Sequence, residues 1–459
     1  MYQINLSEPV KVFFCGIGGI SMSGLAEVLL DAKFEVIGSD RAQSELTDTL
    51  ASHGAKIYIG QVADNITEDI DVFVYTAAIH KDHPEFVRAT ELNIPMLSRA
   101  ELLGQLMRNY KLPIAVSGTH GKTTVTSMIS EIMMEADMDP TLSIGGILDS
   151  IGGNIRIGHS DIFVTEACEY TNSFLNFFPK ATLILNVEED HLDFFKDIDD
   201  IRSSFHRFAC LTPEDGIVIV GGDIPHVDVV LQDVKSEIVT FGKDAKSDYY
   251  PTGIYTDEDG LTHFEVNSPY FSKEEIVLGV PGEHNVLNAL AAIALADFVK
   301  VDRELVKCAL RGFGGAKRRF EKKGIVQGIE ILDDYAHHPS EIRATLKAAR
   351  AYPHKKLWVA FQPHTYTRTK AFLDDFADAL SIADAVILAD IYAAREKNTL
   401  GISSQDILDR LKDRNTEGYY LPSFEEIEKF ILKNCAPGDL LITMGAGDIV
   451  NVGEELLRK

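Results

Sequence analysis

Ser117-Gly118-Thr119-His120-Gly121-Lys122-Thr123-Thr124 is the stretch that decides how this chain of 459 residues is interpreted. An apolar run, 112–116, precedes it, and a helical pattern over about 125–135 follows it. A glycine loop between a strand and a helix points backbone N–H groups at a phosphate, and the helix N-terminus adds positive potential. Lys122 would reach the outer phosphates, and Thr123 would offer its hydroxyl to Mg²⁺. The order predicts a nucleoside triphosphate site, although Val116 stands at the motif's first glycine; the alternative is a tight turn with a solvated lysine.

The composition is strongly acidic. Lys and Arg number 44 against 70 Asp and Glu, which gives a formal charge of −26. Such a surface repels nucleic acid and anionic lipid, so we expect neither nucleic acid nor a membrane as a partner. Five cysteines without paired or metal-binding spacing indicate a reducing compartment. With no recognisable leader and a longest apolar stretch, 289–299, too short for a bilayer, we expect a soluble, cytoplasmic protein.

Apolar runs alternate with helical patterns along the chain, which is typical of doubly wound parallel sheets. Polar residues at 109–111 and glycines within 312–315 mark two joints. We predict an α/β chain of three domains: a Rossmann-like domain at 1–108, a central P-loop ATPase-type domain at 109–315, and a Rossmann-like α/β domain at 316–459. The apolar runs expected to form strands lie at 10–15, 34–40, 72–76, 112–116, 162–165, 181–185, 329–334, 356–361, 385–388 and 440–443.

The first predicted strand runs into Gly16-Ile17-Gly18-Gly19-Ile20-Ser21. This turn is close to the dinucleotide-binding pattern, but Ser21 stands where that pattern has its third glycine. The second predicted strand ends at Asp40, near where a dinucleotide fold places its ribose-binding acid. By itself the turn leaves an NAD site and a plain structural turn open.

Acidic and imidazole side chains follow two strands of the central domain. Glu166 ends a predicted buried strand beside the phosphate loop, where it could hold Mg²⁺ directly or through water. Residues 186–193, Asn-Val-Glu-Glu-Asp-His-Leu-Asp, end the next strand and place His191 among oxygens, which suits a second Mg²⁺ or an orienting contact. A solvated acid at Glu166 or Glu169 and a structural His191 are the alternatives.

Two asparagines, Asn285 and Asn288, lie three residues apart at a predicted helix start and share one face. Their amides could read the edges of adenine, or they could cap the helix. In the last domain, basic residues gather in 317–321, 334–339 and 361–369. Arginines there could neutralise a transferring phosphoryl group or clamp a carboxylate, and a solvated basic face is the alternative.

With these residues in view, the chain resembles the Mur ligase family over nearly its whole length. Gly118-Thr119-His120-Gly121-Lys122-Thr123 looks like that family's ATP loop, and the segments around His191, His284-Asn285 and Arg319-Phe320 follow in the family's order. Asp334-Tyr335-Ala336-His337-His338-Pro339 and Phe361-Gln362-Pro363-His364 look like the alanine-adding branch. The resemblance implies that ATP phosphorylates the lactyl carboxylate of UDP-N-acetylmuramate, and that L-alanine then displaces phosphate from the acyl phosphate, in peptidoglycan precursor synthesis. It also implies Mg²⁺ as cofactor and a monomer or weak homodimer.

The resemblance also assigns the domains and residues. Residues 1–108 would bind the UDP-sugar, 109–315 ATP, and 316–459 the amino acid while closing as a lid. The implied UDP-sugar contacts are Gly18, Gly19, Ile20, Ser21, Asp40 and Thr76. The implied ATP contacts are Gly118, Thr119, His120, Gly121, Lys122, Thr123, Thr124, Asn285, Asn288, Arg319 and Asp334. The implied Mg²⁺ ligands are Thr123, Glu166 and His191, the catalytic residues are Lys122, Glu166, His191 and Arg319, and the amino-acid pocket is Tyr335, His364 and Arg368.

Three positions depart from the family's pattern. Thr365 stands where some members have an arginine, so recognition of the alanine carboxylate should depend more on Arg368. Cys168 replaces an aspartate found in many members, which argues against metal binding there. Several sister ligases carry a carbamylated lysine where this chain has His206, so we expect no such lysine.

Four other activities compete with this interpretation. They are a sister ligase that adds a preformed peptide, a folate-type polyglutamate ligase, a nucleotide-sugar dehydrogenase and a non-catalytic ATP-binding module. Phe361-Gln362-Pro363-His364 argues against the peptide-adding ligase, and the N-terminal nucleotide-sugar domain argues against the folate-type ligase. The phosphate loop argues against the dehydrogenase, and the paired Glu166 and His191 argue against the non-catalytic module. Two candidates stay open for the base that deprotonates the amine: His191 and substrate oxygens.

Overall fold

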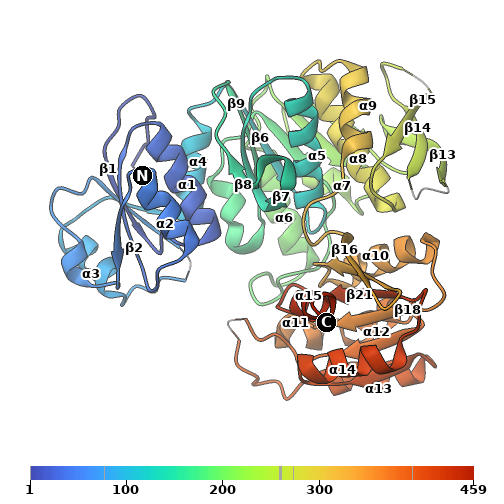
Figure 1. Cartoon of the computed structure of the whole chain (residues 1–459). Helices are drawn as coiled ribbons and strands as arrows, with labels where there is room; N and C mark the ends of the chain where they lie inside the picture. The colour runs from blue at the N-terminus through green and yellow to red at the C-terminus, as the bar shows by residue number, and fades with distance from the viewer. Residues whose placement is uncertain (1, 77, 258–260, 272, 395) are drawn as a thin grey trace. The chain divides into compact units, whose positions relative to one another are not determined.

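The computed structural model describes residues 2–76, 78–257, 261–271, 273–394 and 396–459 (Figure 1). Its contacts divide the chain into two units. The first comprises Met1–Val187, Asp199–Phe241 and Ala291–Val306, and the second comprises Glu188–Ile198, Gly242–Leu290 and Lys307–Lys459.

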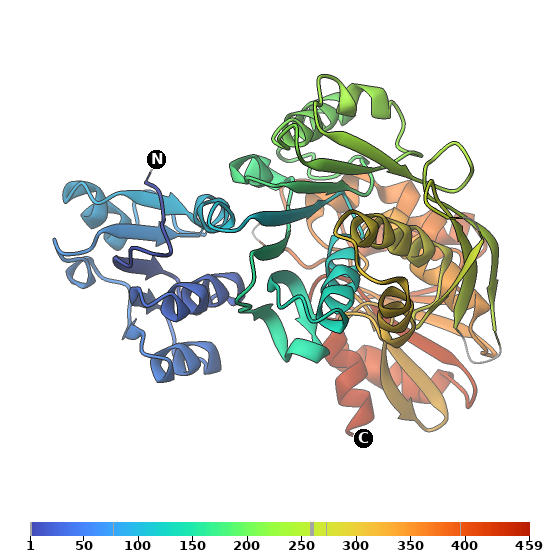
Figure 2. The ribbon, with the colours of Figure 1, turned by 90° about the horizontal axis from the view of Figure 1, so that it is seen from above.

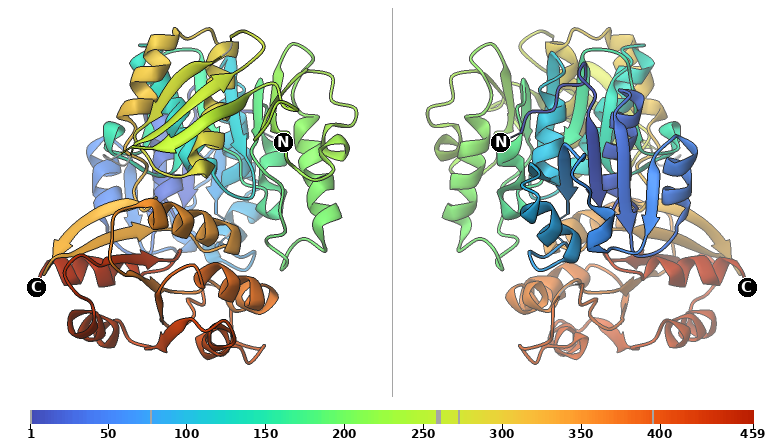
Figure 3. Two further views of the ribbon diagram at one scale, coloured as in Figure 1. Left: turned by 90° about the vertical axis from the view of Figure 1, so that its right-hand side faces the viewer. Right: turned by 90° about the vertical axis from the view of Figure 1, so that its left-hand side faces the viewer.

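A five-stranded parallel sheet opens the first unit, in the order β3-β2-β1-β4-β5 (Figure 3, right). The order reverses between β1 and β4, and ligands of such sheets bind in the crevice outside the strand ends at that point. The strands are β1 (Lys11–Cys15), β2 (Glu35–Asp40), β3 (Lys56–Ile59), β4 (Val72–Tyr75) and β5 (Met96–Ser98). The helices are α1 (Ile20–Asp31), α2 (Glu45–Ser52), the 3₁₀ turn η1 (Ala63–Asn65), α3 (Pro84–Glu91) and α4 (Arg99–Met107).

Serines set the start of two of these helices. Ser44 and Ser98 precede α2 and α4, and each accepts the N–H of the third helical residue in a capping box. Such caps satisfy N–H groups that a helix start otherwise leaves without partners.

A seven-stranded sheet, in the order β12-β11-β10-β6-β9-β7-β8, forms the rest of the first unit's core (Figure 2). All its pairs are parallel except β7 with β8. Ile114, Ala115 and Val116 of β6 are fully buried because helices and neighbouring strands cover both faces. The strands are β6 (Leu112–Ser117), β7 (Thr141–Leu148), β8 (Gly153–Arg156), β9 (Ile162–Glu166), β10 (Ala181–Ile184), β11 (Ile217–Gly221) and β12 (Glu237–Phe241). Helices α5 (Lys122–Glu135), α6 (Ile198–Ala209) and α7 (Val227–Leu231) and the turns η2 (Asp149–Ile151) and η3 (Tyr170–Asn176) connect them.

The second unit contains a small antiparallel sheet of β13 (Tyr250–Thr256), β14 (Thr262–Asn267) and β15 (Glu274–Leu278), seen in Figure 3, left. Helices α8 (Glu283–Phe298) and α9 (Arg303–Gly312) follow it, and each continues across the boundary between the two units.

A six-stranded sheet, in the order β16-β17-β21-β18-β19-β20, completes the second unit. Only β16 with β17 is antiparallel, and the last strand in sequence lies between β17 and β18. The strands are β16 (Glu321–Val326), β17 (Ile329–Asp334), β18 (Leu357–Phe361), β19 (Ala385–Leu388), β20 (Glu417–Tyr420) and β21 (Leu440–Met444). Apolar clusters cover both faces, one with α10 (Pro339–Ala351), α12 (Leu373–Leu380) and α13 (Ser404–Asp413), the other with α14 (Phe424–Asn434) and α15 (Val450–Leu457).

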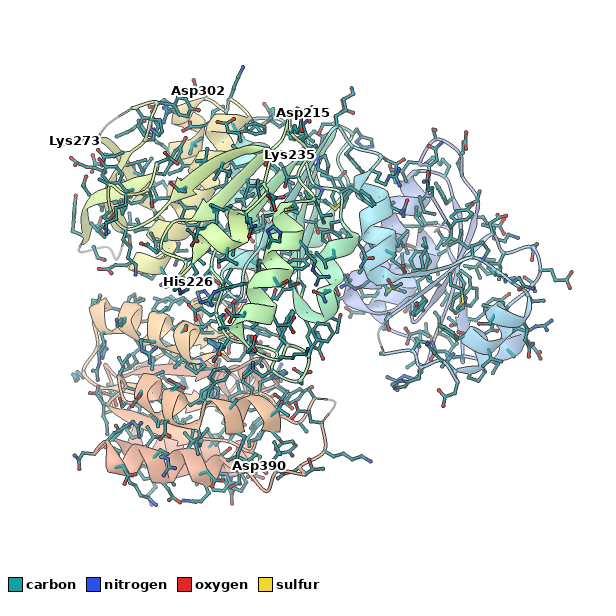
Figure 4. The ribbon with its side chains drawn as sticks, turned by 180° about the vertical axis from the view of Figure 1, so that it is seen from behind. Asp215, His226, Lys235, Lys273, Asp302 and Asp390 are labelled. Carbon is teal, nitrogen blue, oxygen red and sulfur yellow. The ribbon has the colours of Figure 1, made fainter. Side chains whose placement is uncertain are left out.

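The predicted α/β class and each predicted apolar strand are confirmed. The antiparallel pairs β7–β8 and β16–β17 were not predicted, because β7, β8 and β16 lack the unbroken apolar runs of buried parallel strands; β17 itself was predicted as 329–334. The boundaries after 108 and 315 stay a prediction. None of the described helices is both long and apolar enough to cross a bilayer. Acidic and basic side chains such as Asp215, Lys235 and Asp302 are exposed in segments that connect helices and strands (Figure 4).

Gly38 of β2 offers a test of packing beneath the first glycine turn. A Cβ at this position would lie 2.5 Å from Cδ1 of Ile17 and 2.9 Å from the carbonyl oxygen of Phe14. We expect Gly38→Ala to lower the free energy of unfolding by about 1–3 kcal/mol, because the added atom overpacks the core. Thermal unfolding should show a lower midpoint, whereas Gly312→Ala, where a Cβ meets nothing within 4 Å, should not. Equal midpoints for the two variants would contradict this packing.

Candidate active site

The phosphate loop leaves β6 and enters α5 through glycines with left-handed backbone conformations. Gly118 has φ 149°, and Gly121, the residue before α5, has φ 84°. A side chain at Gly118 would also place its Cβ 3.0 Å from Cβ of Leu185. Glycine is the residue that takes such φ values without strain. The predicted order of strand, loop and helix is confirmed, with Lys122, Thr123 and Thr124 in the first turn of α5.

Asn186, the second residue after β10, holds this loop from the side of the neighbouring strand. Its Oδ1 accepts the N–H of His120 at 2.9 Å, and its Nδ2 donates to the carbonyl of His120 at 3.0 Å. The N–H of Thr119 donates to the Asn186 carbonyl at 3.3 Å. Asn186 was named in the sequence analysis only as part of the 186–193 segment and was given no role. Its place at the end of a strand beside β6 could have indicated that it positions the loop.

The Lys122 side chain folds back on its own loop. Its Nζ donates to the carbonyl oxygens of Gly118 and Thr119 and forms an ion pair with Oε2 of Glu169 at 3.0 Å. Burial alone would lower the pKa of Lys122, but the combined attraction of Glu169, Cys168 and Glu166 outweighs it and holds the pKa above its ordinary value. The Lys122 ammonium is therefore charged and lies at the loop. Contact between Lys122 and a phosphate stays a prediction.

Glu169 was given no role by the sequence analysis, which favoured Glu166. It is 2% exposed and neutralises Lys122, whereas Glu166, at the end of β9, accepts the N–H of Gly145 at 2.5 Å. The hydroxyl of buried Thr123 and the carboxylate of Glu166 are oxygen donors of the kind that Mg²⁺ prefers, so this donor set fits the ion. The third predicted ligand, His191, belongs to the other unit, and the shared metal site stays a prediction.

The N-terminal turn is pinned by the strand beside it. The carbonyl of Ser39 accepts the N–H groups of Gly16 and Ile17 at 2.9 and 3.0 Å, and Oδ2 of Asp40 accepts the N–H of Gly18 at 2.9 Å. Asp40 thus shapes the turn, while its predicted place near the uridine stays a prediction. Gly19 precedes α1, in whose first turn Ile20 and Ser21 lie.

Two further side chains lie around the same crevice. Thr76 directly follows β4, at the point where the strand order reverses. Arg99, at the start of α4, donates to Oγ of Ser21 at 3.1 Å, and its burial lowers its pKa. Arg99 was missed because an arginine after a short strand carries no motif. The turn and Arg99 supply backbone N–H groups and one guanidinium, which are the donor types that bind anions, and anion binding here stays a prediction.

In the second unit, the segment Glu188–Ile198 is tied to the C-terminal residues. Nη2 and Nε of Arg368 donate to Oδ1 of Asp190 at 2.8 and 3.0 Å, and a ring nitrogen of His338 lies 3.0 Å from the carbonyl oxygen of Glu189. Burial would raise the pKa of Asp190, but Arg368 and the nearby imidazoles hold it well below its usual range. The loop that carries His191 is thus fixed by a buried ion pair.

The predicted amino-acid pocket comes together around Arg368. Nη1 of Arg368 donates to Nδ1 of His364 at 3.0 Å, and the His364 and His337 rings lie 5.6 Å apart, edge to face. Tyr335 packs on His337 at 5.4 Å. Burial lowers the pKa of both His337 and His364 to about 4, so both rings are neutral near pH 7. The pairing of Arg368 with an alanine carboxylate stays a prediction.

Arg319 and Asp334 also lie close together, but Asp334 has a structural task. Its carboxylate accepts the N–H groups of Phe320 and Ala336 at 2.8 Å each, and burial raises its pKa to about 6. The guanidinium of Arg319 lies 5.4 Å from the centroid of the Tyr335 ring and 3.5 Å from Glu341. Asp334 therefore positions the Arg319 segment, and a direct nucleotide contact of either residue stays a prediction.

The neighbouring Arg318 lies in the predicted basic cluster at 317–321 but was given no role of its own. It donates to Asp333 at 2.9 Å and to the carbonyls of Gly445 and Gly447 after β21 at 2.7 and 3.1 Å. Its role is to join the turn before β16 to the end of β21.

The two asparagines lie in the first turns of α8. Nδ2 of Asn285 donates to the carbonyl of Pro281 at 2.7 Å, and Nδ2 of Asn288 donates to Oδ1 of Asn285 at 3.1 Å. These contacts fix the helix start and orient both amides on one face, as the spacing predicted. Their role toward adenine stays a prediction.

Family models account for each of the three large sheets. The model described as Mur ligase family, catalytic domain, matches residues 11–111, the Mur ligase middle domain matches 116–296, and the Mur ligase, glutamate ligase domain matches 318–447. The chain belongs to the Mur ligase family.

Individual proteins within the family are similar to this chain over its full length. The UDP-N-acetylmuramate–L-alanine ligase of Agathobacter rectalis is 58% identical over 462 residues, which cover 100% of both chains. The crystal structure of the UDP-N-acetylmuramate–alanine ligase MurC of Thermotoga maritima matches with a TM-score of 0.81 and 32% identity over 98% of both chains. A murein peptide ligase of Psychrobacter arcticus matches with a TM-score of 0.70 and 25% identity, again over 98% of both chains.

The two neutral histidines predict a pH dependence of stability. In the unfolded chain a histidine takes up a proton near pH 6.5, whereas His337 and His364 in the fold do so only near 4. Between these values the unfolded state binds more protons, so stability falls as the pH drops from 6.5 to 4. Thermal midpoints measured across this range should fall less steeply in His337→Gln than in the wild type.

Asp334, whose raised pKa favours the folded state at low pH, contributes in the opposite direction. Because Asp334 is present in both the variant and the wild type, its contribution cancels when their slopes are compared. Exposed His226 (Figure 4) supplies the control, because His226→Gln should keep the wild-type slope. Identical slopes for His337→Gln and wild type would contradict the buried, neutral imidazole.

Proposed function

We propose that this chain joins L-alanine to the lactyl carboxylate of UDP-N-acetylmuramate at the expense of ATP, in the synthesis of peptidoglycan precursors. The observation that carries the proposal is the full-length similarity to ligases of that name, combined with an intact glycine loop around Lys122. In this proposal residues 1–108 bind the UDP-sugar, 109–315 bind ATP, and 316–459 bind the amino acid and close over the site.

The first step moves a phosphoryl group. A lactyl carboxylate oxygen attacks the γ-phosphorus of ATP, the bond from phosphorus to the bridging oxygen breaks, and ADP leaves with the electron pair. Carboxylate and triphosphate repel each other, so positive charge must surround the transferring group. Lys122 supplies an ammonium at the loop, and Arg319 supplies a guanidinium. Mg²⁺, when bound, would offset further phosphate charge, and the Thr123 hydroxyl and the Glu166 carboxylate are the oxygen donors that suit it.

The second step forms the amide. The amine of L-alanine attacks the acyl phosphate, and the tetrahedral intermediate collapses with loss of inorganic phosphate. The amine must first lose a proton, and His337 and His364, with pKa values of about 4, are poor proton acceptors at neutral pH. His191 and substrate oxygens are therefore the candidates for the base. Acyl phosphates hydrolyse, so closure of the C-terminal domain serves to exclude water.

Arg368 is the proposed partner of the alanine carboxylate. Asp190 and His364 already fix its guanidinium, so its orientation costs little entropy when the substrate arrives. We further propose that the enzyme works in the cytoplasm, in keeping with five free cysteines, and as a monomer or weak homodimer.

A second candidate is the addition of a preformed peptide to the same sugar, favoured by the similarity to a murein peptide ligase. ADP release with ATP, Mg²⁺ and UDP-N-acetylmuramate separates the two, run with L-alanine, with L-alanyl-D-glutamyl-diaminopimelate, or with neither. We expect release that requires L-alanine and falls on the order of 10²-fold or more in Lys122→Ala, because charge stabilisation is lost. Lys111→Ala, which removes an exposed lysine paired with Asp161, should keep full activity.

Release with the tripeptide alone would assign the peptide-adding activity instead. No release with either amine substrate would overturn the ligase proposal, and a fully active Lys122→Ala would contradict the role of the loop.

Arg368 should govern the affinity for the amino acid. We expect Arg368→Ala to raise KM for L-alanine by about 10-fold or more, since a charge-assisted hydrogen bond contributes about 1.5–3 kcal/mol. Arg368→Lys keeps the charge opposite Asp190 and guards against a folding defect, and Lys370→Ala on the same helix, α11 (Tyr366–Ala371), serves as an exposed control. A change confined to KM for ATP would place the pocket elsewhere.

A further inference from the structure

A second group of metal-ligating side chains lies beneath the N-terminal glycine turn. Cys15 ends β1, His83 precedes α3, and Glu85 lies in the first turn of that helix. One ligand atom from each of the three lies within 4.8 Å of the other two. Sγ of Cys15 is 3.0 Å from Oε2 of Glu85 and 3.9 Å from Nδ1 of His83. Cys15 and Glu85 are fully buried, whereas His83 is partly exposed and gives a route from solvent.

Neighbouring polar groups hold these side chains in place. Oγ of Ser39 donates to Oε2 of Glu85 at 2.6 Å, and Nδ2 of Asn65 donates to Oε1 at 2.7 Å. Nε2 of Gln61 lies 3.5 Å from Sγ of Cys15. Hydrogen bonds of this kind orient the ligands of metal sites from outside. The ligating groups are thus positioned by four separate parts of the fold: β1, β2, η1 and the start of α3.

We propose that Cys15, His83 and Glu85 bind a zinc-class divalent cation, and that its binding weakens the hold of the adjacent glycine turn on the UDP-sugar. The second part rests on the proposed function. A thiolate, a carboxylate and a neutral imidazole carry two negative charges, which a dication neutralises within the buried site. Sulfur and imidazole nitrogen select zinc-like ions over Mg²⁺, which prefers oxygen, and a water would complete a tetrahedron.

Binding must remove a proton. Cys15 now donates its S–H to Glu85, and burial raises the pKa of this thiol. When the cation binds, the S–H bond breaks, the bond from sulfur to the metal forms, and the proton passes to solvent. The affinity should therefore rise with pH.

The same geometry links the site to the turn. Bonds of ~2.0–2.3 Å at tetrahedral angles place two ligand atoms about 3.5 Å apart. The separation of 3.0 Å between Cys15 and Glu85 would have to widen, and that of 3.9 Å between Cys15 and His83 would have to shrink. Cys15 directly precedes Gly16, and Ser39 donates to Glu85 while its carbonyl holds Gly16 and Ile17. A shift of either ligand is thus passed to the turn.

Cobalt(II) tests the site independently of catalysis. The parent for this experiment carries Cys210→Ser and Cys308→Ser, because both thiols are exposed and Sγ of Cys210 lies 3.8 Å from a ring nitrogen of His206. We expect Co²⁺ to give a thiolate-to-cobalt charge-transfer band that Zn²⁺ abolishes. Cys15→Val, which keeps the size and strand preference, and His83→Asn, which suits a helix N-cap, should each weaken binding at least about 100-fold. His80→Asn, an exposed histidine in the same loop, should bind as the parent does.

Kinetics then test the coupling. With Mg²⁺ saturating, Zn²⁺ should raise KM for UDP-N-acetylmuramate in the parent and leave it unchanged in Cys15→Val and His83→Asn, while KM for ATP responds alike in all three. A missing band in the parent, or an equal band in Cys15→Val, would overturn the site. A normal band with an unchanged KM would overturn the coupling. A parent without ligase activity would overturn the proposed function and leave the cobalt titration to decide on the site.

Discussion

The carboxyl end of a parallel strand is where a turn leaves the sheet and where side chains of neighbouring strands converge, and this constraint governs where the chain keeps its chemistry. Gly16–Gly19 follow β1, the phosphate loop follows β6, and His364 follows β18. In the first two cases a residue at or just after the end of an adjacent strand holds the turn. Asp40 does so for the first turn, and Asn186 for the second.

Buried ion pairs are the second constraint on the geometry of the site. Lys122 with Glu169, Arg368 with Asp190, and Arg318 with Asp333 each join a cation to an acid that is nearly or fully enclosed. A charge left without a partner at such a depth would be strongly destabilising, so each pair fixes its two segments relative to one another. Lys122 and Arg368, two of the proposed substrate-binding cations, are therefore positioned by buried acids of the chain itself.

Each apolar run predicted to form a strand does so, because a parallel strand covered on both faces is largely apolar, as 385–388 and 440–443 show. Shorter or more polar strands, such as β3 and β20, were not predicted. The glycine loop was predictable for a similar reason, since strand, loop and helix are contiguous in sequence. Partners set by strand order were not. Arg368 and Asp190 are 178 positions apart, and Lys122 and Glu169 are 47 positions apart. Such pairings depend on which strands lie side by side, and no local pattern encodes that.

The ion pair of Lys122 and Glu169 has a consequence for how the loop responds to salt. A phosphate-binding lysine that stands in water keeps a diffuse cloud of chloride, and an incoming triphosphate must displace it. Here the counterion is a carboxylate of the chain itself, so an arriving phosphate exchanges one anion for another inside the loop. Few mobile ions would be released by this exchange, so in the proposed nucleotide complex this loop adds little to the salt dependence of binding. In a chain with a net charge of −26, the positive charge that the proposed triphosphate site needs is thus held in place by a carboxylate of the chain and not by mobile ions.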